Sequence, residues 1–286
     1  MTLVFVHVPK TAGTTLQSII SRLYKPHEIL AEYPAEPLSR LEQRFKRLST
    51  EQHVTIKAIL GHFPYGSCNW LEERPTYVTV LRDPVDRLIS HYHFVKRAPD
   101  HYLHKTINVQ DMLLEEYVGS GISLEMDNGQ TRMICGPAAM KIPFGQCTAD
   151  MLAEAKYNLR NRIAVVGLTE DFDRTVILMR RMFGWGWPFY VSRNRTRNRP
   201  RRTEIAPETI HMMEEQNRFD IALYNYAREL FNARVLEEGA GFEREVLRFK
   251  RANVTIGKLY CHLHEAPNSA FRWMKRFVSI YTYLSI

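Results

Sequence analysis

The sequence predicts an α/β fold in which helices flank a single parallel β-sheet. Four short apolar runs rich in β-branched and aromatic residues alternate with stretches of helical spacing, which is the pattern of a parallel sheet. These runs cover residues 3–8, 54–60, 76–81 and 163–168. The first run leads through a short loop with a lysine and a glycine into a helix, so the predicted sheet is P-loop-like. Because 45% of its 286 residues are hydrophobic, the chain can bury one good core.

Residues that stop one element and start the next stand at the predicted strand ends. Pro9 and Gly61 end the first two strands, while Asp83 is a good N-cap and Pro84 suits the first position of a helix. Helical spacing predicts helices at 14–23, 38–48, 84–96, 109–118, 149–160, 170–183, 207–217 and 220–236, with loops at 26–37 and 184–202. We therefore expect one domain over residues 1–236 and a helical extension over residues 237–286, packed on that domain.

The loop after the first strand has the features of a phosphate-binding site. The helix begins near Thr14, where unpaired N–H groups and the positive end of the helix dipole favour an anion. Lys10 adds a full positive charge, three threonines add hydroxyl donors, and Gly13 permits a left-handed turn. The loop is not a Walker A motif, because Lys10 precedes the glycine. The alternative interpretation is an ordinary strand-turn-helix with a surface lysine.

Arg82 and His62 each follow a predicted strand, which places both at the carboxyl edge of the sheet, where open α/β sheets bind ligands. Arg82 and the Ser90 hydroxyl, two turns into the next helix, can hold a second phosphate. Alternatively, Arg82 pairs with a local carboxylate. His62 can accept a proton near neutral pH, since the ordinary histidine pKa is about 6.5; a structural role is the alternative. As a base it ranks ahead of the other histidines nearby, His7, His91, His93, His101 and His104.

Two segments of the chain resemble one known family. Residues 7–15, HVPKTAGTT, are similar to the 5′-phosphosulfate loop of sulfotransferases that use 3′-phosphoadenosine 5′-phosphosulfate (PAPS). The loop most resembles the carbohydrate (heparan sulfate/uronyl) 2-O-sulfotransferase branch. Residues 81–92, LRDPVDRLISHY, resemble the family's 3′-phosphate element. With both motifs in the family's order, the chain is identified as a bacterial-type member, which implies a sulfotransferase fold and sulfuryl transfer from PAPS to a carbohydrate hydroxyl.

The resemblance also implies roles for individual residues. His62 corresponds to the family's catalytic base, and Lys10 stabilises the leaving group. Residues 184–202 correspond to a loop that closes over the nucleotide, and residues 127–132 resemble a segment expected to face the acceptor. No metal is expected. The residues expected to contact PAPS are Lys10, Thr11, Ala12, Gly13, Thr14, Thr15, Leu16, Arg82, Ser90, Thr169, Arg197, Asn198 and Arg199.

The charge balance points to an anionic partner. Lysine and arginine number 39 against 31 acidic residues, a net charge of +8 that favours polyanions. With the resemblance, this indicates a saccharide or glycolipid acceptor, which can be acidic, and no nucleic acid. Two other functions stay open. One is a nucleotide-dependent phosphotransferase built on the same loop, and the other is a noncatalytic polyanion-binding protein that uses the arginines of residues 193–202.

The two ends of the sequence suggest where the protein works. Because the first strand begins at residue 3, we expect neither a signal peptide nor a membrane anchor ahead of it, and a cytoplasmic location. The aromatic and basic residues 271–286 leave a peripheral membrane contact open. An oligomer also stays open, since animal members of the resembling branch are trimers.

Overall fold

A parallel five-stranded sheet forms the centre of the protein in a computed structural model that describes residues 1–32, 38–191 and 200–265. The strand order is β2-β3-β1-β4-β5, and every neighbouring pair is parallel. The strands are β1 (Leu3–Val6), β2 (Ile29–Glu32), β3 (Ala58–Gly61), β4 (Thr76–Leu81) and β5 (Ile163–Leu168). The predicted α/β class and all four predicted strands are thus confirmed.

The strand β2 was not predicted, because its residues were assigned to a loop. Ile29 lies opposite Ala58 and Leu30 opposite Ile59, so β2 is an edge strand added to β3. Four residues are too few to show a period of their own, and pairing with a distant segment decides their conformation. The strand β3 is also shorter than predicted, since it begins only at Ala58.

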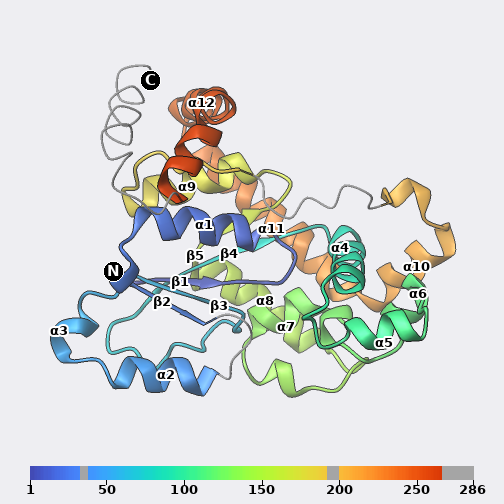
Figure 1. Cartoon of the computed structure of the whole chain (residues 1–286). Helices are drawn as coiled ribbons and strands as arrows, with labels where there is room; N and C mark the ends of the chain where they lie inside the picture. The colour runs from blue at the N-terminus through green and yellow to red at the C-terminus, as the bar shows by residue number, and fades with distance from the viewer. Residues whose placement is uncertain (33–37, 192–199, 266–286) are drawn as a thin grey trace.

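Helices account for most of the remaining described chain. They are α1 (Gly13–Leu23), α2 (Leu38–Lys46), α3 (Thr50–His53), α4 (Pro84–Arg97), α5 (His104–Val109), α6 (Leu114–Gly119), α7 (Gly129–Cys135), α8 (Ala149–Asn161), α9 (Phe172–Phe183), α10 (Pro207–Gln216), α11 (Arg218–Glu237) and α12 (Ala240–Glu265). Short 3₁₀ turns occupy Pro26–Glu28, Leu124–Met126, Ala139–Lys141 and Arg202–Glu204. In Figure 1, α1, α9 and α12 lie above the sheet and α2 below it, while α4, α5, α6 and α10 form a lobe at its right.

The structure supports some predicted helix boundaries and corrects others. Asp83 caps α4 by accepting a hydrogen bond from the Asp86 N–H at 3.0 Å, as predicted. The single helix predicted over residues 109–118 is wrong, because Asp111 adopts a left-handed conformation (φ 43°) that separates α5 from α6. Thr169 does not cap the following helix; α9 starts at Phe172, after Asp171.

Two hydrophobic cores hold these elements together. The larger core surrounds the sheet, where Val4, Phe5, Ile59 and Val78 are fully buried. The smaller core lies in the lobe and joins α4 to α5, α6 and α10; it consists of Val85, Leu88, Ile89, Tyr92, Val95, Leu103, Ile107, Tyr117, Val118, Met126 and Met213. The lobe therefore packs as a unit beside the carboxyl edge of β4, from which α4 begins.

The last described helix, α12, packs against α9. Phe242 and Phe249 bury their rings, and Glu243 accepts hydrogen bonds from Arg174 at 3.0 and 3.1 Å. Further along α12, Val254 is exposed. Within the described ranges, no helix combines the length and apolar character needed to cross a bilayer.

Candidate active site

Three predicted site residues meet at the carboxyl edge of the sheet. Lys10, His62 and Arg82 follow β1, β3 and β4, which are neighbours in the order β3-β1-β4. The Arg82 Nη1 donates to the Lys10 carbonyl oxygen at 3.1 Å, and the His62 Nδ1 lies 3.0 Å from the carbonyl oxygen of His7. Segments more than 50 residues apart in the sequence thus converge on one small region.

The loop before α1 holds its backbone in a strained form. Lys10 (φ 70°) and Ala12 (φ 63°) both adopt the left-handed region, although neither is glycine. Such conformations cost about 1–3 kcal/mol each and are found most often at ligand-binding and catalytic sites. Two of them within three residues, at the N-terminus of a helix, indicate that the loop is built for binding rather than for stability.

Gly13 serves a different purpose from the one predicted. It is the first residue of α1 and not the left-handed one, since that conformation falls on Lys10 and Ala12. A Cβ atom added to Gly13 would lie 1.7 Å from the Nε2 of His7. The glycine is needed because the His7 ring packs directly against the backbone there.

The threonines of this loop are not equivalent. The Thr11 hydroxyl is buried and donates to the Val8 carbonyl oxygen at 2.8 Å, so it ties the loop to the end of β1. The Thr14 side chain is exposed and that of Thr15 is buried. The N–H groups of Thr15 and Leu16 donate to the Ala12 carbonyl oxygen, and Leu16 lies in the core. Leu16 therefore packs, and a bound anion would be met by groups that precede Thr15 in α1.

The Lys10 ammonium loses its proton at a lower pH than an ordinary lysine does. Its ammonium lies 3.9 Å from the centre of the Phe94 ring, a cation–π contact between the loop and α4. Burial and the nearby charge of Arg82 lower the pKa of Lys10 to about 8, although Glu125 opposes the shift. Lys10 is therefore mostly protonated at neutral pH and deprotonates only slightly above it.

His62 is placed and tuned as a proton acceptor. Since a carbonyl oxygen only accepts, the contact with His7 puts the ring hydrogen on Nδ1 and the lone pair on Nε2. The side chain is exposed at the sheet edge, and its ring centre lies 4.1 Å from that of His7. Partial desolvation lowers the pKa of His62 below 6.5, so the ring is neutral at pH 7. A neutral imidazole with a defined lone pair is what a general base requires.

A carboxylate that was not predicted lies close to these groups. Glu125 Oε2 is 2.8 Å from His91 Nε2, and the Tyr117 hydroxyl is 3.1 Å from His91 Nδ1. Burial disfavours the charged form of Glu125, but the charge and hydrogen bond of His91, together with Arg87, hold its pKa at about 2. An ionised carboxylate with so low a pKa is a weaker base than His62. The sequence carried no signal for this pair, because 34 positions separate the two residues.

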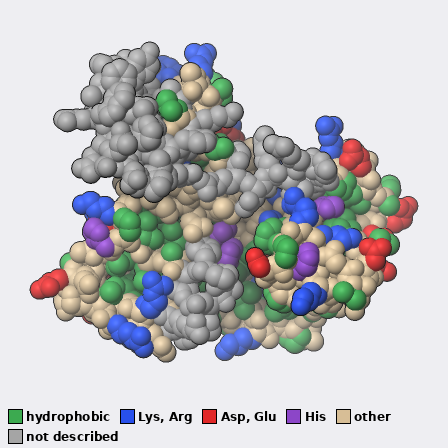
Figure 2. All heavy atoms as spheres, viewed as in Figure 1, with side chains coloured by type: hydrophobic (Ala, Val, Ile, Leu, Met, Phe, Trp, Pro, Cys, Tyr) green, Lys and Arg blue, Asp and Glu red, His purple; other side chains and the backbone are tan. Residues whose placement is uncertain are grey.

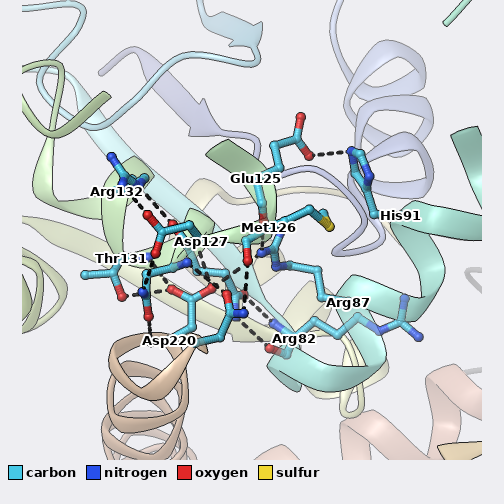
Figure 3. A network of polar contacts seen from close by, with 12 residues as sticks. Arg82, Arg87, His91, Glu125, Met126, Asp127, Thr131, Arg132 and Asp220 are labelled. Carbon is cyan, nitrogen blue, oxygen red and sulfur yellow. Dashed lines mark hydrogen bonds and ion pairs between the residues drawn. The ribbon is translucent and has the colours of Figure 1, made fainter. Parts of the chain in front are cut away.

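The Arg82 backbone is held by a glutamine from another helix. Gln130 Oε1 accepts from the Arg82 N–H at 3.0 Å, and Gln130 Nε2 donates to the Arg82 carbonyl oxygen at 2.9 Å. The Asp220 carboxylate in turn accepts from the Gln130 N–H and from the Thr131 N–H and hydroxyl, over 2.7–3.1 Å. Figure 3 shows the contact between Thr131 and Asp220, to the left of Arg82. Gln130 is thus a positioning residue for Arg82.

The expectation that residues 127–132 face the acceptor is wrong. Asp127, Gln130, Thr131 and Arg132 are at most 1% exposed, and Arg132 forms an ion pair with Asp127. Arg132 also donates to the backbone carbonyl oxygens of Asp127, Ala139, Ile142 and Pro143. A polar run of this kind looks functional in a sequence, but buried charges must be paired, and here the pairing partners are internal.

The other predicted nucleotide contacts are placed as follows. Ser90 is buried on α4. Thr169 donates through both its N–H and its hydroxyl to the Leu81 carbonyl oxygen, at 2.8 and 3.1 Å, so it fastens the end of β4 next to Arg82. Arg197, Asn198 and Arg199 lie outside the described residues. In the described ranges, no group of three or more His, Cys, Asp or Glu side chains is arranged to hold a metal ion.

A parallel sheet with a strand-loop-helix turn at its carboxyl edge is the architecture typical of α/β proteins that bind nucleotides. The model of the sulfotransferase family matches residues 1–227, and the chain belongs to this family. It is 30% identical over 273 residues to heparan-sulfate 6-O-sulfotransferase 2 of Danio rerio, and 29% identical over 279 residues to the human 6-O-sulfotransferase 1. It is 26% identical over 251 residues to heparan sulfate 2-O-sulfotransferase 1 of Xenopus laevis.

These alignments cover 80–81% of the chain. They span 58% of the Danio rerio protein, 66% of the human protein and 70% of the Xenopus laevis protein. Both 6-O- and 2-O-sulfotransferases match. The chain is therefore related to carbohydrate sulfotransferases, and the matches do not favour one of the two groups. Mouse sulfotransferase SULT7A1, complexed with PAP, aligns at 13% identity with a TM-score of 0.44 over 79% of this chain and 88% of its own, too slight a similarity to argue from.

Proposed function

We propose that the protein transfers a sulfuryl group from PAPS to a hydroxyl of a polysaccharide. The observation that carries this proposal is the contact between Arg82 Nη1 and the Lys10 carbonyl oxygen, which brings the segments that follow β4 and β1, each with one cationic side chain, next to each other. A donor with a phosphate at each end of an adenosine needs two such cationic sites. The sulfotransferase family supports the reaction type, and the heparan-sulfate relatives support a polysaccharide acceptor.

The donor is held, in this proposal, by the loop and by the end of β4. The first turn of α1 and the ammonium of Lys10 bind the 5′-phosphosulfate, because the helix dipole and the lysine charge favour an anion there. Arg82 and Ser90 bind the 3′-phosphate. Gln130 fixes the Arg82 backbone through two hydrogen bonds. The guanidinium is thereby oriented before the donor arrives.

Residues at the sheet edge supply the base and the cation that the transfer step requires. The acceptor oxygen forms a bond to sulfur while the bond between sulfur and the bridging phosphate oxygen breaks. His62 Nε2 takes the proton of the acceptor hydroxyl, and Lys10 stabilises the negative charge on the departing oxygen of 3′-phosphoadenosine 5′-phosphate (PAP). Positioning and charge stabilisation supply most of the rate in this scheme, as they do in phosphoryl transfer.

Labelled sulfate transfer from PAPS to a panel of glycans tests the proposal. We expect incorporation into one or more acidic or neutral polysaccharides by the wild-type protein and none by His62→Ala. His211→Ala serves as the matched control, because His211 lies exposed on α10, away from the sheet edge. Incorporation of label from γ-labelled ATP and Mg²⁺, with none from PAPS, would instead make the protein a phosphotransferase.

A further inference from the structure

An exposed aromatic ring lies on the lobe that borders the sheet edge and has no part in holding the donor. Tyr102 is 72% exposed, although large aromatic side chains are usually covered. It follows α4 in the lobe, where Figure 2 shows hydrophobic, histidine and charged side chains gathered on one surface. One face of the Tyr102 ring stacks on His101, with ring centres 4.7 Å apart and planes at 25°.

A chain of ring contacts joins Tyr102 to the proposed leaving-group residue. His101 packs edge-on against Phe94, with ring centres 5.8 Å apart. Phe94 in turn carries the Lys10 ammonium 3.9 Å from its ring centre. Two ring–ring contacts and one cation–π contact therefore connect the exposed ring to the lysine, on the lobe beside the sheet edge.

The carboxylate of Glu125 borders the same surface. His101 packs against His91 with ring centres 5.8 Å apart, and His91 Nε2 lies 2.8 Å from Glu125 Oε2. The Ser123 hydroxyl accepts from the Glu125 N–H at 3.3 Å, which holds the backbone of Glu125 in place. The Glu125 side chain keeps 31% of its surface exposed.

We propose that Tyr102 and Glu125 form an acceptor subsite that binds an uncharged sugar unit, which rests on the proposed function. The open face of Tyr102 stacks against the apolar C–H face of a pyranose, and the Glu125 carboxylate accepts hydrogen bonds from its hydroxyls. Removing the C–H face from water favours such stacking. A uronate would bring a second negative charge to Glu125, so a hexose or an N-acetylhexosamine is selected at this position.

The charge state of Glu125 supports this selectivity. Its carboxylate faces the imidazole of His91, while Arg87 donates to its backbone carbonyl oxygen. The hydrogen bond and charge of His91, together with the charge of Arg87, keep the pKa of Glu125 at about 2 against the effect of burial. Glu125 is therefore negative at neutral pH. Its charge also raises the pKa of Lys10 and of His62, in opposition to the effect of burial on both groups.

Calorimetry on protein saturated with PAP, with one neutral and one acidic probe, tests the subsite. The probes are the tetrasaccharide of N-acetylglucosamine and tetragalacturonate. We expect the neutral probe to bind at least tenfold tighter than the acidic one. Tyr102→Ala should lower the affinity for the neutral probe tenfold or more, while the affinity of Tyr102→Phe should stay within threefold of that of wild type. Tyr157→Ala is the matched control, because Tyr157 is an exposed tyrosine of α8.

Glu125→Gln separates the charge from the hydrogen bonds. We expect the ratio of the affinity for tetragalacturonate to the affinity for the neutral probe to rise at least fivefold in this variant. Failure of the neutral probe to bind wild type, or an unchanged affinity in Tyr102→Ala, would overturn the subsite. If both probes behave as expected but no glycan receives label from PAPS, the subsite stands and the proposed function fails. PAP affinity within twofold of wild type in every variant shows that the donor site is intact.

Discussion

Two polar regions flank the end of β4, and they differ in how their charges are satisfied. At the sheet edge, Lys10 and His62 have lowered pKa values, and the backbone of Lys10 is left-handed. Beneath it, Asp127 and Asp220 are at most 1% exposed and close their hydrogen bonds internally. The first region keeps exposed polar groups, while the second buries its polar groups and pairs them. The comparison teaches that burial and internal pairing, not residue type, separate the scaffold from the site.

The largest effect is expected at the base. His62→Ala should lower kcat for sulfuryl transfer by about 10²–10⁴-fold, because this exposed, oriented imidazole takes the proton of the acceptor hydroxyl in the proposed step. Steady-state rates at saturating PAPS measure this loss. The melting temperature should stay close to that of the His211→Ala control. A loss of folded protein would instead show that the role of His62 is structural.

The next effect is on stability and belongs to the buried region. Asp220→Ala should lower the free energy of unfolding by about 3–5 kcal/mol, since it removes the carboxylate that lies 3.5 Å from the buried Arg87 guanidinium. It also removes the acceptor for Gln130 and Thr131. Urea unfolding measures the change, with the exposed residue Asp100→Ala as control. Equal stability of the two variants would mean that the network is dispensable.

A smaller loss of stability is expected at the start of α1, in the sheet-edge region. Gly13→Ala should cost about 1–3 kcal/mol of stability, because the added Cβ forces the His7 ring to move. Gly186→Ala is the matched control, since a Cβ there meets no atom within 4 Å. Thermal unfolding of both proteins decides the point. A neutral Gly13→Ala would show that the His7 ring has room to turn aside.

The smallest effect is a change in pH dependence. The value of kcat/KM for PAPS should fall about tenfold per pH unit above pH 8, because Lys10 loses its proton there before the donor binds. On the acid side, activity should persist below pH 6.5, since the pKa of His62 is lowered. Lys10→Arg should remove the alkaline fall while keeping a cation. A wild-type profile flat to pH 10 would contradict the assignment of Lys10.

What could be predicted from the sequence followed from local chemistry. Pro9, Lys10 and Arg82 stand next to their strands in the chain, so parallel pairing alone brings them to one edge. The strand β2 and the role of Gly13 could not be predicted, because they depend on Ala58 and on the position of the His7 ring. The buried network likewise closes through Asp220, about 90 positions from its partners. Tyr102 and Glu125 belong to the same group, since only folding shows which rings are covered.

The most direct test of the account is the calorimetric affinity of PAP for wild type, Lys10→Ala and Arg82→Ala. If one nucleotide is held by both residues, each substitution should weaken binding tenfold or more. The exposed control Arg160→Ala should stay within twofold of wild type. Unchanged affinity in both Lys10→Ala and Arg82→Ala would contradict the central claim that the two strand ends hold a single doubly phosphorylated donor.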